Sequence, residues 1–487
     1  MNSLTHSKNS TILPLVTALA LNVMTASASQ NLPFRLGDEG TITFNQTSAP
    51  PERHHHRSPT PTPAPTATAT ATPTATVART PTPTATPTAT SIPTSNKFGF
   101  SYPNFTGAVG AMTAQRFVTV FAAAMHNPNV YRRWINTGQD IRLLNPNGVY
   151  LKHLSIRTID PVYETSEGHP SYNYVTQNHP EWIIRDANGH TVPLFRSSEF
   201  CVDFGNPAYL DYVFGIWFPQ TYMDSTDINV ARFTGYLQDN GVFQRQNINC
   251  GANNPVCTRY TTDTGMQAAW KTLLDKFHQY FPHKIILVNT TENPELTPAQ
   301  QLPWKEDVLS HSNGYFSEYL TNNHAYWGNQ SNTNKRNALY FGLQMADWCA
   351  SHGKYFYPNL GMGDGNEPTQ SEINYGFAYF NLSRKGNRQF FTIVTKDNSN
   401  NCTGGCWQPR TYPEQNLDLG QPIENRVEIQ TNVWRRTFTN SIAYVNLSDN
   451  SVSIMLPTGT WRNSLGQVIS SPLTLTSFNG LTIYRTL

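Results

Sequence analysis

Residues 284–319 read KIILVNTTENPELTPAQQLPWKEDVLSHSNGYFSEY, and this stretch decides the class of fold. The apolar run at 284–288 predicts a buried strand, and a helical pattern follows at 298–310. A second β-type run at 314–319 begins about 30 residues after the first, a spacing typical of βαβ units. Because the two strands of such a unit lie parallel in one sheet, the stretch predicts an α/β fold.

The same alternation continues on both sides of this stretch. Further strand-like runs lie at 98–102, 148–156, 233–237, 354–357 and 389–394. Further helical patterns lie at 115–126, 206–217, 265–280, 334–351 and 370–381. About eight strand-like segments predict a (β/α)8 TIM barrel, which contains eight parallel strands. A doubly wound open sheet is the alternative, although no GxGxxG loop follows any strand to support its nucleotide-binding form.

The pattern changes again near Asp418. Short β-type runs at 442–447, 451–456 and 481–485 are separated by turn residues, and no helical pattern fits. We therefore expect a catalytic barrel at 97–417 followed by a small C-terminal antiparallel β-sandwich at 418–487.

The N-terminal part reads as an export signal and a spacer. An interrupted apolar run ends at an Ala-x-Ala pattern, which predicts a signal peptide at 1–28. Residues 29–96 are expected to be disordered and include a Pro/Thr-rich linker with almost no apolar bulk. No later segment has the roughly 18 consecutive apolar residues of a membrane helix. The sequence predicts a secreted or cell-surface protein with no integral membrane segment in its mature chain.

Composition favours a neutral ligand. The formal net charge is +2, charged residues make up 14% and aromatic residues 12%. With no basic stripe, a nucleic-acid partner is not expected. A surface rich in hydrogen-bonding but uncharged side chains suits a polysaccharide or oligosaccharide substrate, and we expect a monomer that needs no cofactor and no metal.

All 6 cysteines lie after Phe200, and an even number in an exported chain favours disulfides. Cys250–Cys257 and Cys402–Cys406 are the short-loop candidates, which leaves Cys201 and Cys349. A zinc site is the weaker alternative because no paired CxxC spacing is present.

Two carboxylates follow predicted strands. Asp239 ends the run at 233–237 and precedes an Asn-Gly turn, and Glu318 ends the short aromatic strand within the run at 314–319. In a barrel the carboxyl ends of the strands meet at one mouth, so both side chains are expected there. The alternative is that Asp239 caps a turn or helix and Glu318 pairs with a lysine.

Glycoside cleavage requires two carboxyl groups with different environments. The aromatic neighbours of Glu318 would favour its protonated form and the role of acid, whereas polar neighbours would hold Asp239 ionised as nucleophile or base. Whether the reaction retains or inverts the anomeric configuration stays open. Further substrate contacts are expected from Asp203, Trp182, Asn240, Tyr319, Trp327 and Asp364. For Asp203 the alternative is a helix cap, and for the aromatic residues it is a place in the core.

Five short motifs also resemble a known family. They are NHPEWIIRDANG at 178–189, VDFGNPAY at 202–209, GYLQDN at 235–240, GYFSE at 314–318 and LDLGQP at 417–422. In this order they resemble a family of hypothetical glycosyl hydrolases that form TIM barrels with a C-terminal β-sandwich, over about Lys97 to Leu487. The resemblance implies the barrel, Asp239 and Glu318 as catalytic carboxylates, and a carbohydrate substrate.

Three functions follow in order of support. The first is a secreted glycoside hydrolase that cleaves a polysaccharide with two carboxylates. The second is a non-catalytic carbohydrate-binding or cell-surface protein on a barrel scaffold, since fold alone does not fix function. The third is a metal-dependent deacetylase or lyase, which the lack of clustered His and Asp ligands disfavours.

Overall fold

The computed structural model describes residues 98–101, 121–125, 149–162, 168–194, 197–223, 234–239, 241, 243–244, 258–290, 293–317, 330–361, 368–385, 388–397, 406–408 and 412–485. All of them belong to one of the two units into which the chain divides, Ala85–Leu487. The signal peptide and linker expected at 1–28 and 29–96 lie outside the described residues.

Nine strands of the described residues form one sheet in the order β1-β2-β3-β6-β7-β8-β9-β10-β11. Neighbouring strands from β1 to β10 pair in parallel, and β11 pairs antiparallel with β10. β1 and β10 also approach each other. The strands are β1 (Phe98–Ser101), β2 (Phe121–Met125), β3 (Val149–Leu154), β6 (Gly235–Gln238), β7 (Ile285–Asn289), β8 (Gly314–Ser317), β9 (Tyr355–Gly361), β10 (Thr392–Asp397) and β11 (Cys406–Gln408).

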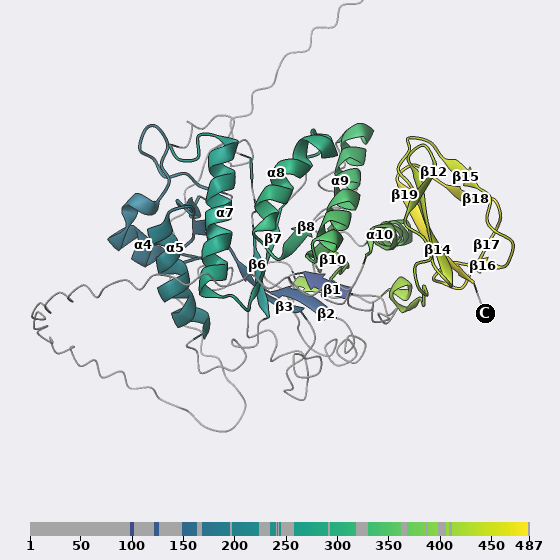
Figure 1. The fold of residues 1–487 in the computed structure, drawn as a ribbon, viewed down its shortest axis with the longest axis horizontal. Coiled ribbons are helices and arrows are strands. Elements are labelled where there is room, and N and C mark those ends of the chain that lie inside the picture. The colour runs from purple at the N-terminus through teal and green to yellow at the C-terminus, as the bar shows by residue number, and fades with distance from the viewer. Residues whose placement is uncertain are drawn as a thin grey trace, which may run out of the picture. The chain divides into compact units, whose positions relative to one another are not determined.

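Helices alternate with these strands. α7, α8 and α9 stand side by side, and each contacts the next (Figure 1). Capping boxes begin α8 at Thr297 and α10 at Thr369, which explains where these helices start. The helices are α4 (Tyr172–Asn178), α5 (Pro207–Tyr212), α7 (Asp263–Tyr280), α8 (Pro298–Ser310), α9 (Asn332–Ser351) and α10 (Gln370–Ser383). Short 3-10 helices are η1 (Pro180–Trp182) and η5 (Pro413–Asn416), and π-helical segments are η2 (Val213–Trp217) and η3 (Pro219–Met223).

The sheet is apolar on both faces. Alternate strand residues such as Ile286 and Val288 join the large cluster that includes α7 and α8. Their neighbour Leu287 points to the other face, where a second cluster draws residues from β3, β6, β7, β8 and β9. Burial on both faces is typical of parallel sheets and explains the continuous apolar run at 284–288.

The segment between β3 and α5, residues 155–206, is an insertion that we call the hairpin insertion. Its strands β4 (Thr158–Ile159) and β5 (Phe200–Cys201) pair antiparallel, and a backbone bridge joins Ile183 to Val202. Three extended segments therefore lie side by side beyond the carboxyl end of β3.

The C-terminal β region has two antiparallel sheets. One has the order β12-β13-β14-β19-β16-β17 and the other pairs β15 with β18, and both contribute to one apolar cluster. α10 packs against β14 and β19 of this region. The strands are β12 (Val427–Gln430), β13 (Val433–Thr437), β14 (Ser441–Asn446), β15 (Val452–Ile454), β16 (Trp461–Arg462), β17 (Val468–Ile469), β18 (Leu473–Leu475) and β19 (Asn479–Arg485).

The structure corrects one predicted element and confirms the strand–helix–strand unit at 284–319 as far as residue 317. The helix expected at 115–126 is wrong where the structure describes it, because residues 121–125 form β2. The run Phe-Ala-Ala-Ala-Met suits a strand buried on both faces as well as a helix, and periodicity does not separate the two in so short a segment.

Two further expectations concern cysteines and membrane segments. Cys201 and Cys349 are buried free thiols, and burial raises the pKa of Cys201 to about 11. Cys406 begins β11, whereas Cys250, Cys257 and Cys402 lie outside the described residues. The disulfides Cys250–Cys257 and Cys402–Cys406 therefore stay predictions. Within the described ranges, no helix combines the length and apolar character needed to cross a bilayer.

Candidate active site

Asp239 lies at the carboxyl end of β6, between side chains from the two neighbouring strands. Asn289 at the end of β7 donates its Nδ2 to Asp239 Oδ1 at 2.6 Å. His153 of β3 places its Nε2 3.1 Å from Asp239 Oδ2. His153 is 2% exposed, whereas the Asp239 side chain is 20% exposed. One carboxylate oxygen therefore accepts a hydrogen bond, the other lies close to His153, and the group still reaches solvent.

Backbone register brings these three side chains together. Leu154 pairs with Gln238 across β3 and β6, and the Asp239 amide donates to the Leu154 carbonyl at 2.8 Å. Just beyond, the Gly241 amide donates to the Asn289 carbonyl at 2.7 Å. A Cβ at Gly241 would lie 2.5 Å from a methyl of Val288, so only glycine fits this approach of the loop to β7.

A buried polar layer follows β3, and one of its members, Arg157, interacts electrostatically with Asp239. Thr158 donates its hydroxyl to Glu199 Oε1 at 3.0 Å and lies 3.1 Å from His169 Nδ1. Arg157, Glu199 and His169 are each at most 2% exposed. In the part of the chain that the structure describes, Arg157 Nε and Nη2 have no hydrogen-bond acceptor.

Charge in this layer is partly balanced. Burial lowers the pKa of Arg157, and the nearby Cys201, Glu199 and Asp239 reduce that lowering without cancelling it. A donor that faces a carboxylate favours its ionised form, as the Asn289 amide does for Asp239. The arrangement suits Asp239 as a charged group that attacks a carbon or accepts a proton, rather than as an acid.

Several residues expected at the site lie outside the described residues. They are Glu318, Asn240, Tyr319, Trp327 and Asp364. Ser317, the residue before Glu318, ends β8, which pairs in parallel with β7. One strand, β7, therefore separates the strand that precedes Asp239 from the strand that precedes Glu318.

Asp203 lies on the hairpin insertion and is held by two side chains. Arg259 donates to its Oδ2 from Nε at 2.7 Å and from Nη2 at 2.5 Å, and the Tyr260 hydroxyl donates to its Oδ1 at 2.5 Å. Asn206, and not Asp203, caps α5, because the Asn206 side chain accepts from the Ala208 amide. Asp203 instead lines a pocket, described below.

Trp182 corrects one predicted substrate contact. Its indole is 4% exposed, stacks on His179 with ring centroids 3.8 Å apart, and meets Tyr209 edge-on. Little of either face remains for a sugar ring, since burial of so large an aromatic surface is itself favourable. Trp182 belongs to the core.

His153 and Asn289 are functional candidates that the sequence analysis did not identify. Each is a buried polar residue in a strand run rich in apolar residues, YLKHLSI for His153 and KIILVN for Asn289. A polar residue buried at 2% or 6% in such a run signals a specific partner. Among the described residues, no group of three His, Cys, Asp or Glu side chains is arranged to hold a metal ion.

The sequence profile of the hypothetical glycosyl hydrolase family 15 matches residues 149–442, which include β3, Asp239 and the start of the C-terminal β region. The chain belongs to this family. Membership agrees with the resemblance read from the five motifs, and it associates the chain with glycoside-acting enzymes. No curated protein sequence matches the chain.

Solved structures show only a distant likeness. A maltogenic α-amylase AmyB from Thermotoga neapolitana has 9% identity and a TM-score of 0.42, covering 81% of this chain and 99% of its own. Amy13B from Eubacterium rectale has 9% identity and a TM-score of 0.43, with coverages of 81% and 96%. A GH13_31 family enzyme has 11% identity and a TM-score of 0.45, with coverages of 80% and 99%. These scores are too low to assign fold or activity.

Proposed function

We propose that this family member is an exported glycoside hydrolase that cleaves a polysaccharide at the carboxyl ends of β6 and β8. The observation that carries the proposal is the Asp239 carboxylate, held by His153 and Asn289 and still partly exposed. Glu318, the next residue after β8 in the sequence, is proposed as its partner. The carboxyl ends of β6 and β8 lie at the same edge of the parallel sheet with β7 between them, which supports bringing the two acids to one mouth.

A closed (β/α)8 barrel with a C-terminal β-sandwich is part of this proposal. The approach of β1 to β10 and the apolar cluster on the sheet face opposite α7 and α8 support closure, since a barrel interior is filled by such residues. The shared apolar cluster of the two C-terminal sheets supports the sandwich.

In the proposed reaction Glu318 donates a proton to the leaving glycosidic oxygen as its bond to the anomeric carbon breaks. Asp239 then either attacks that carbon, in a retaining reaction, or takes a proton from the water that attacks it, in an inverting one. Either route adds one water across the bond, and neither requires an oxidant or a cofactor.

The test is hydrolysis of a polysaccharide panel by the full chain, with product analysis. Asp239→Asn and Glu318→Gln should each lower turnover at least about a hundredfold, as loss of acid–base or nucleophilic groups does. Asp307→Asn on α8, an exposed aspartate paired with Lys271, is the matched control and should retain full activity. Product anomers at early times distinguish retention from inversion.

Two outcomes contradict the proposal. Wild-type turnover in either variant would remove the catalytic assignment. Binding of a polysaccharide without cleavage by the wild-type chain would favour a carbohydrate-binding protein on the same scaffold.

A further inference from the structure

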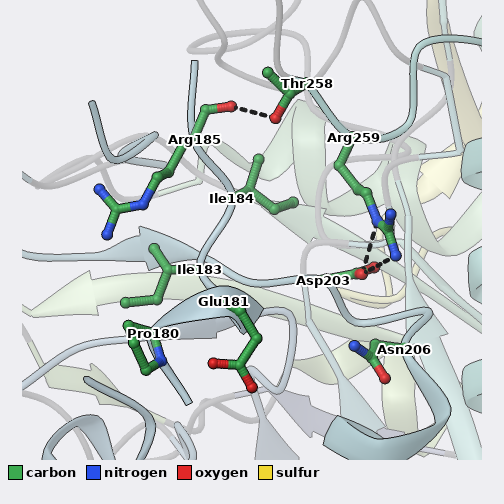
Figure 2. A pocket seen from close by; sticks show the side chains of 9 residues that line it. All are labelled: Pro180, Glu181, Ile183, Ile184, Arg185, Asp203, Asn206, Thr258 and Arg259. Carbon is green, nitrogen blue, oxygen red and sulfur yellow. Dashed lines mark hydrogen bonds and ion pairs between the residues drawn. The ribbon is translucent and has the colours of Figure 1, made fainter. Parts of the chain in front are cut away.

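A pocket lies on the hairpin insertion, and Asp239 is not among the residues that line it. Its volume is about 480 Å³, and it is formed by the segment 180–185, by Asp203 and Asn206, and by Thr258 and Arg259 (Figure 2). None of the residues that line it takes part in the proposed bond cleavage. All of its lining residues belong to the described part of the chain.

One wall of the pocket is polar. Figure 2 shows Glu181, Asn206 and the Asp203–Arg259 pair along this wall. The Glu181 side chain is 62% exposed, and its Oε1 lies 3.0 Å from His179 Nδ1. The Arg259 side chain is 59% exposed although it holds Asp203, so its guanidinium retains N–H groups that can reach a ligand.

The rest of the lining is apolar, and the lining as a whole carries no net charge. Ile183 and Ile184 are each more than nine-tenths buried and form the apolar part with Pro180. Two carboxylates, Glu181 and Asp203, balance the guanidinium groups of Arg185 and Arg259. A charged ligand would therefore gain no compensating charge, whereas a neutral one keeps this balance.

A neutral sugar ring matches this combination. Its C–H face is apolar and suits the isoleucines, and its hydroxyls form a ring of donors and acceptors. Paired hydroxyls can donate to the Glu181 carboxylate and accept from the Arg259 guanidinium, two groups that form strong hydrogen bonds.

A series of backbone hydrogen bonds connects the segment that carries Asp239 with the segment that lines the pocket. Asp239 bonds to Leu154, the segment after Leu154 bonds through Arg157 to Val202, and Val202 bridges to Ile183. Two strand spacings therefore separate the β4 segment from the pocket segment, or about 10 Å. A saccharide of several units could contact both the pocket and the carboxylate.

We propose that this pocket is a distal subsite that binds one neutral sugar unit of the same substrate chain whose cleavage is assigned to Asp239. The inference rests on the proposed function and adds to it a substrate that is uncharged and longer than a disaccharide. Glu181 is then a residue that determines affinity for long substrates, without a part in the chemistry.

The test compares Glu181→Gln with Glu428→Gln, a matched exposed glutamate on β12 of the C-terminal β region. Isothermal titration uses the full chain carrying Asp239→Asn, with cello-, xylo-, manno- and malto-oligosaccharides from disaccharide to heptasaccharide, and with oligogalacturonides as acidic probes. Glu181→Gln should weaken binding of the longest neutral oligomers about tenfold, as loss of one charge-assisted hydrogen bond does. Disaccharide binding should not change.

Kinetics in an otherwise wild-type chain provide a second measurement. Glu181→Gln should raise KM for the polysaccharide and leave kcat on the shortest cleavable oligosaccharide unchanged, as removal of ground-state binding does. If the wild-type chain cleaves the polysaccharide but Glu181→Gln leaves the affinity for every oligomer unchanged, the subsite alone is overturned. Preference for oligogalacturonides would also overturn it, whereas a chain that cleaves no polysaccharide overturns the proposed function first.

Discussion

Arg157 and Arg436 are both buried, at 2% and 4% exposure, but their guanidinium groups lie in opposite surroundings. Arg436 of β13 donates Nη1 to the carbonyls of Asn381 and Arg384 at the end of α10, and Nε to the Glu424 carbonyl. Within the described ranges, Arg157 has no acceptor for Nε or Nη2. Arg436 binds the carbonyls at the end of α10, whereas Arg157 lies in the buried polar layer near enough to Asp239 to interact with it electrostatically.

The difference between the two surroundings indicates that Arg436 contributes to stability and Arg157 to function. A buried donor without an acceptor costs about 1–3 kcal/mol, so such groups are rare where packing alone is at stake. Around Arg436, helix-end carbonyls that would otherwise be orphaned gain a donor. Around Arg157, the open donors lie in the same polar layer as the carboxylate proposed to act on substrate. Substitutions in the two regions should therefore separate unfolding free energy from turnover.

The largest effect is expected for Arg436→Lys. Lysine keeps the charge but lacks the planar fork that reaches several carbonyls, so the free energy of unfolding should fall by about 3 kcal/mol. Turnover per folded molecule should not change. Urea denaturation measures the first quantity, and activity corrected for the folded fraction measures the second.

The neighbouring Arg435→Lys is the matched control. Arg435 forms a partly exposed pair with Glu424 at 3.1 Å, and such pairs contribute at most about 1 kcal/mol. If Arg436→Lys is as stable as this control, the carbonyl contacts do not stabilise the junction of α10 with the C-terminal β region.

A somewhat smaller effect is expected for His153→Ala. Loss of a hydrogen bond to a charged group is worth about 1.5–3 kcal/mol, so kcat/KM should fall about 10- to 150-fold. His153→Gln, whose amide can still donate, should recover part of the loss. His190→Ala removes an exposed histidine–aspartate pair, His190 with Asp186 at 3.2 Å, and should have no effect. Equal activity in the His153 and His190 variants would show that His153 does not position Asp239.

The sequence predicts the apolar framework better than the polar site. Residues 284–319 carry their own signals, a β-type run, a capped helix and a second run, and the structure follows them as far as residue 317. Asp239 is identifiable because it stands where a strand run stops. His153 and Asn289 could not be assigned to it, because their contact depends on which strands are neighbours and in what register. For Trp182 the sequence left a substrate contact and a place in the core open, because residue type alone does not distinguish a buried indole from an exposed one.

Arg157→Lys tests the other half of the comparison. The charge that balances Glu199 and Asp239 stays, so the free energy of unfolding should change by no more than about 1 kcal/mol. The buried Nε and Nη2 donors are lost, and kcat/KM should fall about tenfold if Arg157 positions Asp239 through the polar layer, the cost of one hydrogen bond. A variant that is destabilised as much as Arg436→Lys, with unchanged kcat/KM, would place Arg157 among the structural arginines.

The smallest effect concerns Asp347, which accepts from Arg426 at 2.6 Å and pairs with Lys385 at 2.7 Å. Burial would raise the pKa of this carboxyl, but hydrogen bonds from Arg426 and Lys385 outweigh burial and hold the pKa below its usual value. A carboxyl with a lowered folded pKa stabilises the protein above its unfolded pKa of about 3.9, and this contribution is lost as pH falls through the folded value.

Asp347→Asn should therefore lower the free energy of unfolding by at most about 1 kcal/mol at pH 7, because the aspartate is partly exposed. At a pH below the folded pKa of Asp347 the variant and the wild-type chain should converge, as both lack the charge. Asp307→Asn on α8 serves as the exposed control. A difference that is the same at both pH values would assign Asp347 a packing role. A shift in the pH profile of kcat would mean that this junction is coupled to the site around Asp239, contrary to the separation that the two arginines indicate.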